Sequence, residues 1–163
     1  MGMFSAAIAL LSSGGGFQQK ELPERHSSRD VEIKSSILVI DDDPMLLQTA
    51  RTLFIKRGFN VLTSSSVPRG LGVLRNAVGG IQVVLLNCGM LKLSGDESLK
   101  FVRQLRPNAK VIGLTAVNLE SVPREHLDSV DKMLSKPVIA STLIATVDGL
   151  LGDAQTASSA IQS

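Results

Sequence analysis

Three acidic residues that directly follow a short apolar run are the first candidates for chemistry in this sequence. The run "ILVI" at 37–40 ends at Asp41, Asp42 and Asp43. Clustered carboxylate oxygens are typical of sites that bind Mg²⁺, a hard cation that prefers oxygen ligands. A second apolar run, in "VVLLNCGM" (83–90), ends on Asn87, which supplies an amide instead of an acid. The chemistry of the site therefore depends on what an amide can do beside two or three carboxylates.

Two further polar residues end later apolar runs. Thr115 follows "KVIGL", and Lys136 follows "DKMLS" and precedes Pro137. A threonine at the end of a strand is often there for its β-propensity alone, and a lysine before a proline is often a surface residue. Both residues nevertheless end a strand-like run, as the acids and the amide do. We therefore treat Thr115 and Lys136 as candidates for the same site.

Alternation of strand-like and helix-like patterns explains how these residues could meet. Strands are expected at 37–40, 59–64, 81–87, 110–115 and 131–135, and helices at 44–57, 66–78, 95–105, 119–128 and 139–151. Such alternation predicts an α/β fold with an open parallel sheet and right-handed crossovers. At this size the flavodoxin-like strand order 2-1-3-4-5, with helices on both faces, is expected. Sites in such sheets lie beyond the carboxyl ends of the strands, where the polar residues listed above occur.

Local signals mark where several of these elements begin and end. Asp43 followed by Pro44 is typical of a helix N-cap with proline in the first turn. Gly58 after two basic residues predicts the end of that helix, and Pro107 ends the third helix. Pro123 falls inside the expected fourth helix, which should therefore be short or displaced.

Four stretches in this order resemble the receiver domain of two-component response regulators. They are "ILVIDDDP", "VVLLNCGMLKLSG", "VIGLTA" and "MLSKP", and the resemblance covers about 36–151. An orthodox receiver accepts a phosphoryl group from a histidine kinase on its own aspartate. The resemblance implies that Asp41 and Asp42 hold Mg²⁺ together with the backbone carbonyl of Gly89. It also implies that Thr115 is the pocket hydroxyl and Lys136 the pocket lysine.

The sequence departs from the family at the phosphoacceptor itself, where Asn87 replaces the aspartate. The nearest following acid is Asp96, too far along the chain to replace it. An amide nitrogen is not a nucleophile at neutral pH, and an amide brings no negative charge to a metal. Mg²⁺ binding is therefore expected to be weak or vestigial, and no catalytic residue is assigned. Lys136, without an acceptor carboxylate, is expected to pair with Asp41 or Asp42.

Two other positions also depart from the family pattern. The family usually has a proline after the loop methionine, and here Met90 is followed by Leu91. The aromatic switch residue three positions before the lysine is replaced by Met133. Because methionine packs in many rotamers, it would make a poor two-position rotor. These differences favour a receiver that does not use the usual phosphorylation switch.

The function expected is that of an atypical, stand-alone receiver-like module in a two-component phosphorelay. It is predicted to act by protein–protein binding. It is not expected to be an enzyme, and it is not expected to be phosphorylated at the usual site. The expected partner is a histidine kinase, a phosphotransfer protein or another response regulator. One variant of this hypothesis is a competitor that occupies a kinase. The alternative is a small-ligand-binding flavodoxin-like module, although the sequence has no phosphate-binding glycine loop after the first strand.

Composition narrows the remaining function classes. The chain has 163 residues, 44% hydrophobic and 20% charged, which fits one globular domain. A net charge of +2 without a basic cluster, and 3% aromatic residues, argue against a nucleic-acid partner. No apolar run reaches the length of a membrane span. A single cysteine, Cys88, excludes an intrachain disulfide and fits a cytoplasmic location.

The two ends of the chain lack a sustained apolar period. Residues 1–35 are predicted to be a disordered tail, 36–151 the receiver domain and 152–163 a second tail. The apolar stretch "MFSAAIALL" (3–11) has no basic segment before it, so a secretory signal is not favoured. His26 and His126 are expected to be exposed to solvent, and no metal-ligand spacing links them.

Overall fold

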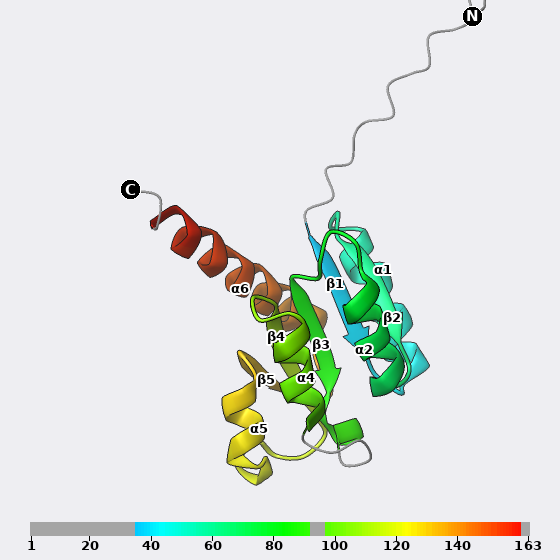
Figure 1. Ribbon diagram of the computed structural model, residues 1–163. Helices are drawn as coiled ribbons and strands as arrows, with labels where there is room; N and C mark the ends of the chain where they lie inside the picture. Colours follow the sequence, from blue (N-terminus) through cyan, green and yellow to red (C-terminus); the bar gives the residue numbers. More distant parts are fainter. Residues whose placement is uncertain (1–34, 92–96, 161–163) are drawn as a thin grey trace, which may run out of the picture. The chain divides into compact units, whose positions relative to one another are not determined.

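A five-stranded parallel sheet forms the centre of the computed structural model, which describes residues 35–91 and 97–160, with side chains up to 153. The predicted tail at 1–35 lies almost entirely outside the described residues. The strands are β1 (Ser36–Ile40), β2 (Asn60–Ser64), β3 (Val83–Asn87), β4 (Lys110–Thr115) and β5 (Lys132–Ser135). Their order is β2-β1-β3-β4-β5, which confirms the predicted flavodoxin-like topology. Every neighbouring pair is parallel, so all five carboxyl ends lie at one edge of the sheet (Figure 1).

Helices cover both faces of this sheet (Figure 1). The α-helices are α1 (Pro44–Ile55), α2 (Val67–Asn76), α4 (Glu97–Leu105), α5 (Arg124–Ser129) and α6 (Ala140–Ala160). Two short 3₁₀ helices, η1 (Cys88–Met90) and η2 (Leu119–Ser121), follow β3 and β4. The core has two parts, because alternate strand residues point to opposite faces. Leu38 and Ile40 pack with residues of α2 and α4, whereas Ile37 and Val39 pack with residues of α1 and α6.

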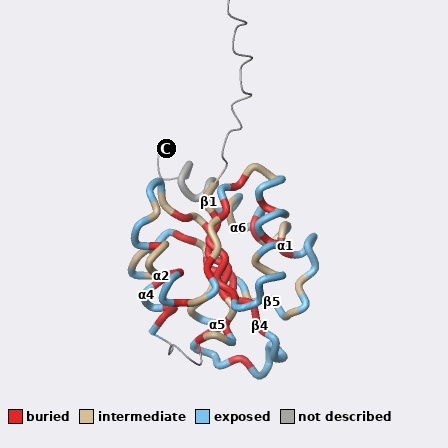
Figure 2. Tube along the Cα trace, turned by 90° about the vertical axis from the view of Figure 1, so that its right-hand side faces the viewer, coloured by how far each residue is buried: buried red, intermediate tan, exposed pale blue. Residues whose placement is uncertain are grey.

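The central strands are almost fully buried (Figure 2). Four consecutive residues of β1, from Ile37 to Ile40, and four of β3, from Val83 to Leu86, have no exposed surface. Strands covered on both faces lose their alternation of polar and apolar residues, which explains the continuous apolar runs in the sequence. The rigid centre therefore fixes the positions of the polar residues that end β1 and β3.

Several boundary predictions are confirmed. The Asp43 side chain caps α1 by accepting a hydrogen bond from the Met45 N–H at 2.9 Å. Gly58 has a φ of 85°, the left-handed conformation that ends a helix without a Cβ clash. Pro123 displaces the fourth helix as expected: α5 begins directly after it, preceded only by η2.

Two sequence-based expectations are wrong. The last helix does not end at 151 but continues through Ala160, into the segment predicted as a tail. Gly152 does not stop it, because it lacks the left-handed φ of a C-terminal glycine, and no proline follows. His126 is not solvated: it is 9% exposed on the inner side of α5.

Candidate functional site

The polar residues that end four strands meet at the carboxyl edge of the sheet. Asp41 follows β1, Asn87 ends β3, Thr115 ends β4 and Lys136 follows β5. The backbone continues to hold them beyond the strands, since the Lys136 N–H donates to the Thr115 carbonyl at 2.7 Å. The structure therefore brings together the four residues that were predicted to share one site. Their functional roles stay predictions.

The shortest side-chain contact in this cluster is an ion pair between Asp41 and Lys136. Lys136 Nζ lies 2.6 Å from Asp41 Oδ2, and the Asp41 side chain has no exposed surface. A buried carboxylate is costly unless it is paired and hydrogen-bonded. Asp41 Oδ1 meets this need by accepting a hydrogen bond from the Asp43 N–H at 2.9 Å. The prediction that Lys136 pairs with one of the first two acids is confirmed, and the partner is Asp41.

Asn87 is oriented by its own loop. Its Oδ1 accepts a hydrogen bond from the Gly89 N–H at 3.0 Å, which caps η1. Its Nδ2 consequently faces the acids, and donates to Asp42 Oδ1 at 2.8 Å and to Asp41 Oδ1 at 3.4 Å. The amide thus acts as a donor between two carboxylates, where an aspartate could only repel them.

This arrangement does not fit a metal ion as it stands. A cation between Asp41 and Asp42 would meet the N–H groups of Asn87 instead of an oxygen ligand. Turning the amide would offer Oδ1 but would break its hydrogen bond with Gly89. Among the residues that the structure describes, no group of three or more histidine, cysteine or acidic side chains could hold a metal. The assignment of Asp41, Asp42 and the Gly89 carbonyl as Mg²⁺ ligands stays a prediction.

Thr115 faces its own following loop. The side chain is 4% exposed, and Oγ1 accepts a hydrogen bond from the Val117 N–H at 3.2 Å. A hydroxyl that caps the loop in this way holds the loop start close to the end of β4. Its role as a pocket hydroxyl rests on the resemblance and remains a prediction.

A sulfur-lined corner lies beneath the site. Cys88 Sγ is 3.8 Å from Met133 Sδ, and both side chains cover Gly113 in the middle of β4. A Cβ at Gly113 would lie 2.6 Å from Met133 Sδ and 2.9 Å from Cys88 Sγ. Burial raises the pKa of the Cys88 thiol to about 11, despite the hydrogen bond at Leu114 and the charge of Lys136. Sequence reasoning missed Gly113, although an isolated glycine in a strand often marks such a close approach.

Sequence comparison places this geometry in a known family. The model of the response regulator receiver domain matches residues 37–148. A CpxR homolog of Haemophilus influenzae, described as a transcriptional regulatory protein, is 34% identical over 119 residues, covering 72% of this chain and 50% of that protein. The sensor histidine kinase RcsC of Salmonella typhimurium is 30% identical over 128 residues, which is 77% of this chain but 13% of the kinase. The chain thus spans half or less of these relatives.

Solved structures of receiver domain proteins are also similar to this chain. A response regulator receiver domain protein from Clostridium thermocellum is 31% identical with a TM-score of 0.66, and the match covers 75% of this chain and 98% of that one. A CheY-like receiver domain protein from Methanospirillum hungatei JF-1 is 26% identical, also with a TM-score of 0.66, over 75% of this chain and 97% of that one. In the described part of the chain, no helix combines the length and apolar character of a membrane span. The chain belongs to the response regulator receiver domain family of two-component signalling.

Proposed function

We propose that this receiver signals by protein binding and is not phosphorylated at the family's usual position. The observation that carries the proposal is the 2.8 Å hydrogen bond from Asn87 Nδ2 to Asp42 Oδ1. It shows an amide donor at the place where the resemblance calls for a nucleophilic carboxylate. An amide nitrogen has no available lone pair for attack on a phosphoryl group, so the group transfer cannot begin there.

The same contacts favour a single resting arrangement. Asp41 is neutralised by Lys136 at 2.6 Å, and both acids receive a donor from Asn87. In an orthodox receiver these groups would be rearranged by the phosphoryl group and its metal. Here the Lys136 ammonium, which would serve a phosphoryl group, and the two carboxylates, which would serve a cation, already have partners. A signal would therefore have to come from a binding partner that prefers this arrangement, not from the pocket.

Weak Mg²⁺ binding is part of the proposal. Two carboxylates and a carbonyl are oxygen ligands of the right type, but the cation would have to displace the Nδ2 group of Asn87 and compete with Lys136 for Asp41. These competing contacts lower the affinity. No step of the proposed function uses the metal.

The proposed partner is a histidine kinase, a phosphotransfer protein or another response regulator. Segments similar to this chain occur both in the sensor histidine kinase RcsC and in a transcriptional regulatory protein. The protein would compete for the kinase surface that an active receiver uses, but it would not accept the phosphoryl group of the kinase. Binding without chemistry makes the protein a non-enzymatic module.

A phosphodonor experiment tests the proposal. The purified full chain is incubated with Mg²⁺ and acetyl phosphate, and intact mass spectrometry is used to count phosphoryl groups. We expect none on the wild type and one acid- and base-labile acyl phosphate on the Asn87→Asp variant. Asn108→Asp is the matched control, because Asn108 is an exposed amide on another loop. An acyl phosphate on the wild type would overturn the proposal.

A further inference from the structure

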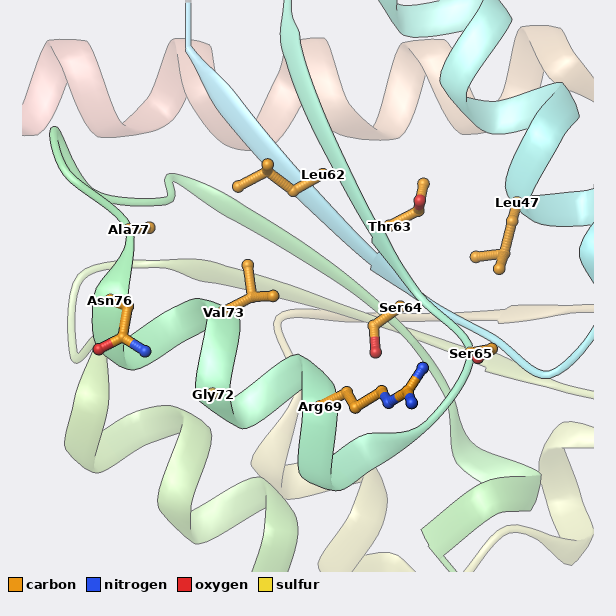
Figure 3. Close-up of a pocket in the computed structure, with 10 residues that line it drawn as sticks. All are labelled: Leu47, Leu62, Thr63, Ser64, Ser65, Arg69, Gly72, Val73, Asn76 and Ala77. Atoms are coloured by element: carbon orange, nitrogen blue, oxygen red, sulfur yellow. The ribbon is translucent and has the colours of Figure 1, made fainter.

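A groove at the edge of the sheet lies outside the pocket described above. It has a volume of about 740 Å³ and runs between β2, the first part of α1 and one side of α2 (Figure 3). Residues from Leu62 to Ser65 form its floor along β2, and Leu47 of α1 closes one side. Neither the acids nor Asn87 and Lys136 line it, so it can act independently of the degenerate pocket.

The floor of this groove is an unpaired strand edge. Among the described strands, β2 is the last on its side of the sheet and pairs only with β1. In that pairing the Asn60 N–H donates to the Ser35 carbonyl, and the Ser64 carbonyl accepts from Asp41. Backbone groups of a parallel strand alternate between its two sides, so Thr63 must direct its N–H and C=O away from β1 and into the groove.

One end of the edge is already covered. The Arg51 guanidinium of α1 donates to the Val61 carbonyl at 3.4 Å, as expected for an outward-facing group. No side chain within the described part of the chain serves Thr63 in the same way. An exposed strand edge is a ready template for another strand, and proteins usually protect it. Here the protection covers Val61 but leaves the backbone N–H and C=O of Thr63, near the end of β2, without a partner among the described residues.

The opposite wall is a single stripe of α2 and its C-cap residue, Ala77. Arg69, Gly72, Val73, Asn76 and Ala77 follow helical spacing and all face the groove. A Cβ added at Gly72 would meet no atom within 4 Å, so the glycine leaves the wall open where a side chain would narrow it. The space is therefore a consequence of the sequence of α2.

The charge of the groove has one sign. Arg69 is exposed, and its guanidinium extends from the first turn of α2 toward Ser64 and Ser65 (Figure 3). No acidic residue lines the groove, and Arg69 has no salt-bridge partner among the described residues. A ligand that leaves this guanidinium opposite a carboxylate would gain a charge-assisted hydrogen bond.

We propose that this groove binds an extended peptide segment of a partner protein, which adds to β2 as a sixth strand and directs an acidic side chain at Arg69. The backbone of the peptide would pair with Thr63, and its alternate side chains would lie against Leu47 on one side and Gly72 and Val73 on the other. A second copy of this chain fits less well. The residues that line its own groove include the same Arg69 and no acidic side chain, so this edge offers the guanidinium no carboxylate.

A selection experiment tests the proposal on the full chain. Short random peptides displayed on phage are selected against the wild type, and the enriched sequences are synthesised with a fluorescent label. We expect acidic, β-branched sequences that bind Gly72→Leu about tenfold more weakly, a loss near 1.4 kcal/mol. Gly149→Leu is the matched control, since a Cβ there also meets nothing within 4 Å but lies on α6, away from the groove.

Two further measurements identify the mode of binding. Replacing the peptide acid with lysine should weaken binding to the wild type and restore binding to Arg69→Glu. Bound peptide should slow amide exchange at Thr63 by about tenfold, whereas Leu62, already paired with β1, should change little. The proposal is overturned if no peptide is enriched, if binding survives Gly72→Leu, or if the chain forms a dimer that Gly72→Leu abolishes.

Discussion

Lys136 Nζ lies 2.6 Å from Asp41 Oδ2, and the carboxylate it neutralises has no exposed surface. The two residues are 95 positions apart in the chain, yet they follow strands of the same sheet at the same edge. In a receiver that accepts a phosphoryl group, this lysine would serve the acceptor. In this chain it pairs instead with Asp41, the acid that the resemblance predicts as a metal ligand.

Removal of the lysine should be costly for the fold. Lys136→Met leaves a buried carboxylate with only the Asp43 N–H and the weak contact from Asn87. We expect the free energy of unfolding to fall by about 3 kcal/mol, as is usual when one partner of a buried pair is lost. Urea denaturation followed by circular dichroism measures it. Lys132→Met is the control, because Lys132 is exposed on β5, and it should change stability by less than about 0.5 kcal/mol. Equal effects of the two variants would mean that the ion pair contributes nothing.

The variant Asn87→Asp should be less stable than the wild type without a cation and should bind Mg²⁺ more tightly. It replaces a donor 2.8 Å from Asp42 with a third carboxylate, so like charges repel in the absence of a cation. We expect a lower melting temperature in EDTA, and a rise with Mg²⁺ that is larger than in the wild type. Thermal denaturation across a Mg²⁺ titration measures both, with Asn108→Asp as the control. A wild type stabilised by Mg²⁺ as strongly as the variant would contradict weak metal binding.

The sheet could be predicted from the sequence because its determinants are local. Continuous apolar runs mark buried parallel strands, and Asp43 and Gly58 mark helix ends through backbone rules that involve few residues. The end of α6 was missed because Gly152 permits a stop without requiring one. The burial of His126 was missed because it depends on how the short helix after Pro123 packs, which no local pattern encodes.

The candidate site was predictable as a set of residues but not as a network. Strand topology implies that Asp41, Asn87 and Lys136 share one edge. It does not decide which acid the lysine selects, since that depends on which side chain is buried. Nor does it reveal that Gly89 turns the Asn87 amide so that its nitrogen faces the acids. The contact of Met133 with Gly113 required the side chains of two adjacent strands, and a sequence offers only a weak signal for it.

Asp131 should make stability depend on pH at the other end of β5. Burial raises its pKa, but the hydrogen bonds from the Val111 N–H and Arg103, with the charges of Arg103 and Lys110, outweigh this and lower it below 3.8. A lowered pKa in the folded state means that the ionised form stabilises the fold. The contribution is therefore present at neutral pH and is lost as the pH falls below about 4.

The variant Asp131→Ala isolates this effect. It leaves the N–H of buried Val111 without its acceptor at 2.7 Å and Arg103 without its partner at 2.8 Å. We expect a loss of about 1–3 kcal/mol at pH 7, because a buried donor is left unsatisfied. The loss should shrink as the pH is lowered toward 3. Asp128→Ala, three residues earlier on the end of α5, is the control. A difference between wild type and Asp131→Ala that is the same at both pH values would rule out the ionised carboxylate as the cause.

Cys88 should be unreactive in the folded protein. Its side chain is buried against Met133, and burial raises its pKa from 9.0 to about 11, so almost no thiolate is present at pH 7.5. Because the thiolate is the reactive form, we expect modification by Ellman's reagent to be slower than in urea by at least about a hundredfold. Since the raised pKa means that the protonated thiol stabilises the fold, stability should also decline as the pH rises from about 9 toward 11. Met133→Ala opens the space beside the sulfur and should increase the folded-state rate, whereas Met45→Ala, at an exposed site on α1, should leave it unchanged. Rapid modification of the folded wild type would show that the thiol is accessible and would contradict the expected protection by burial.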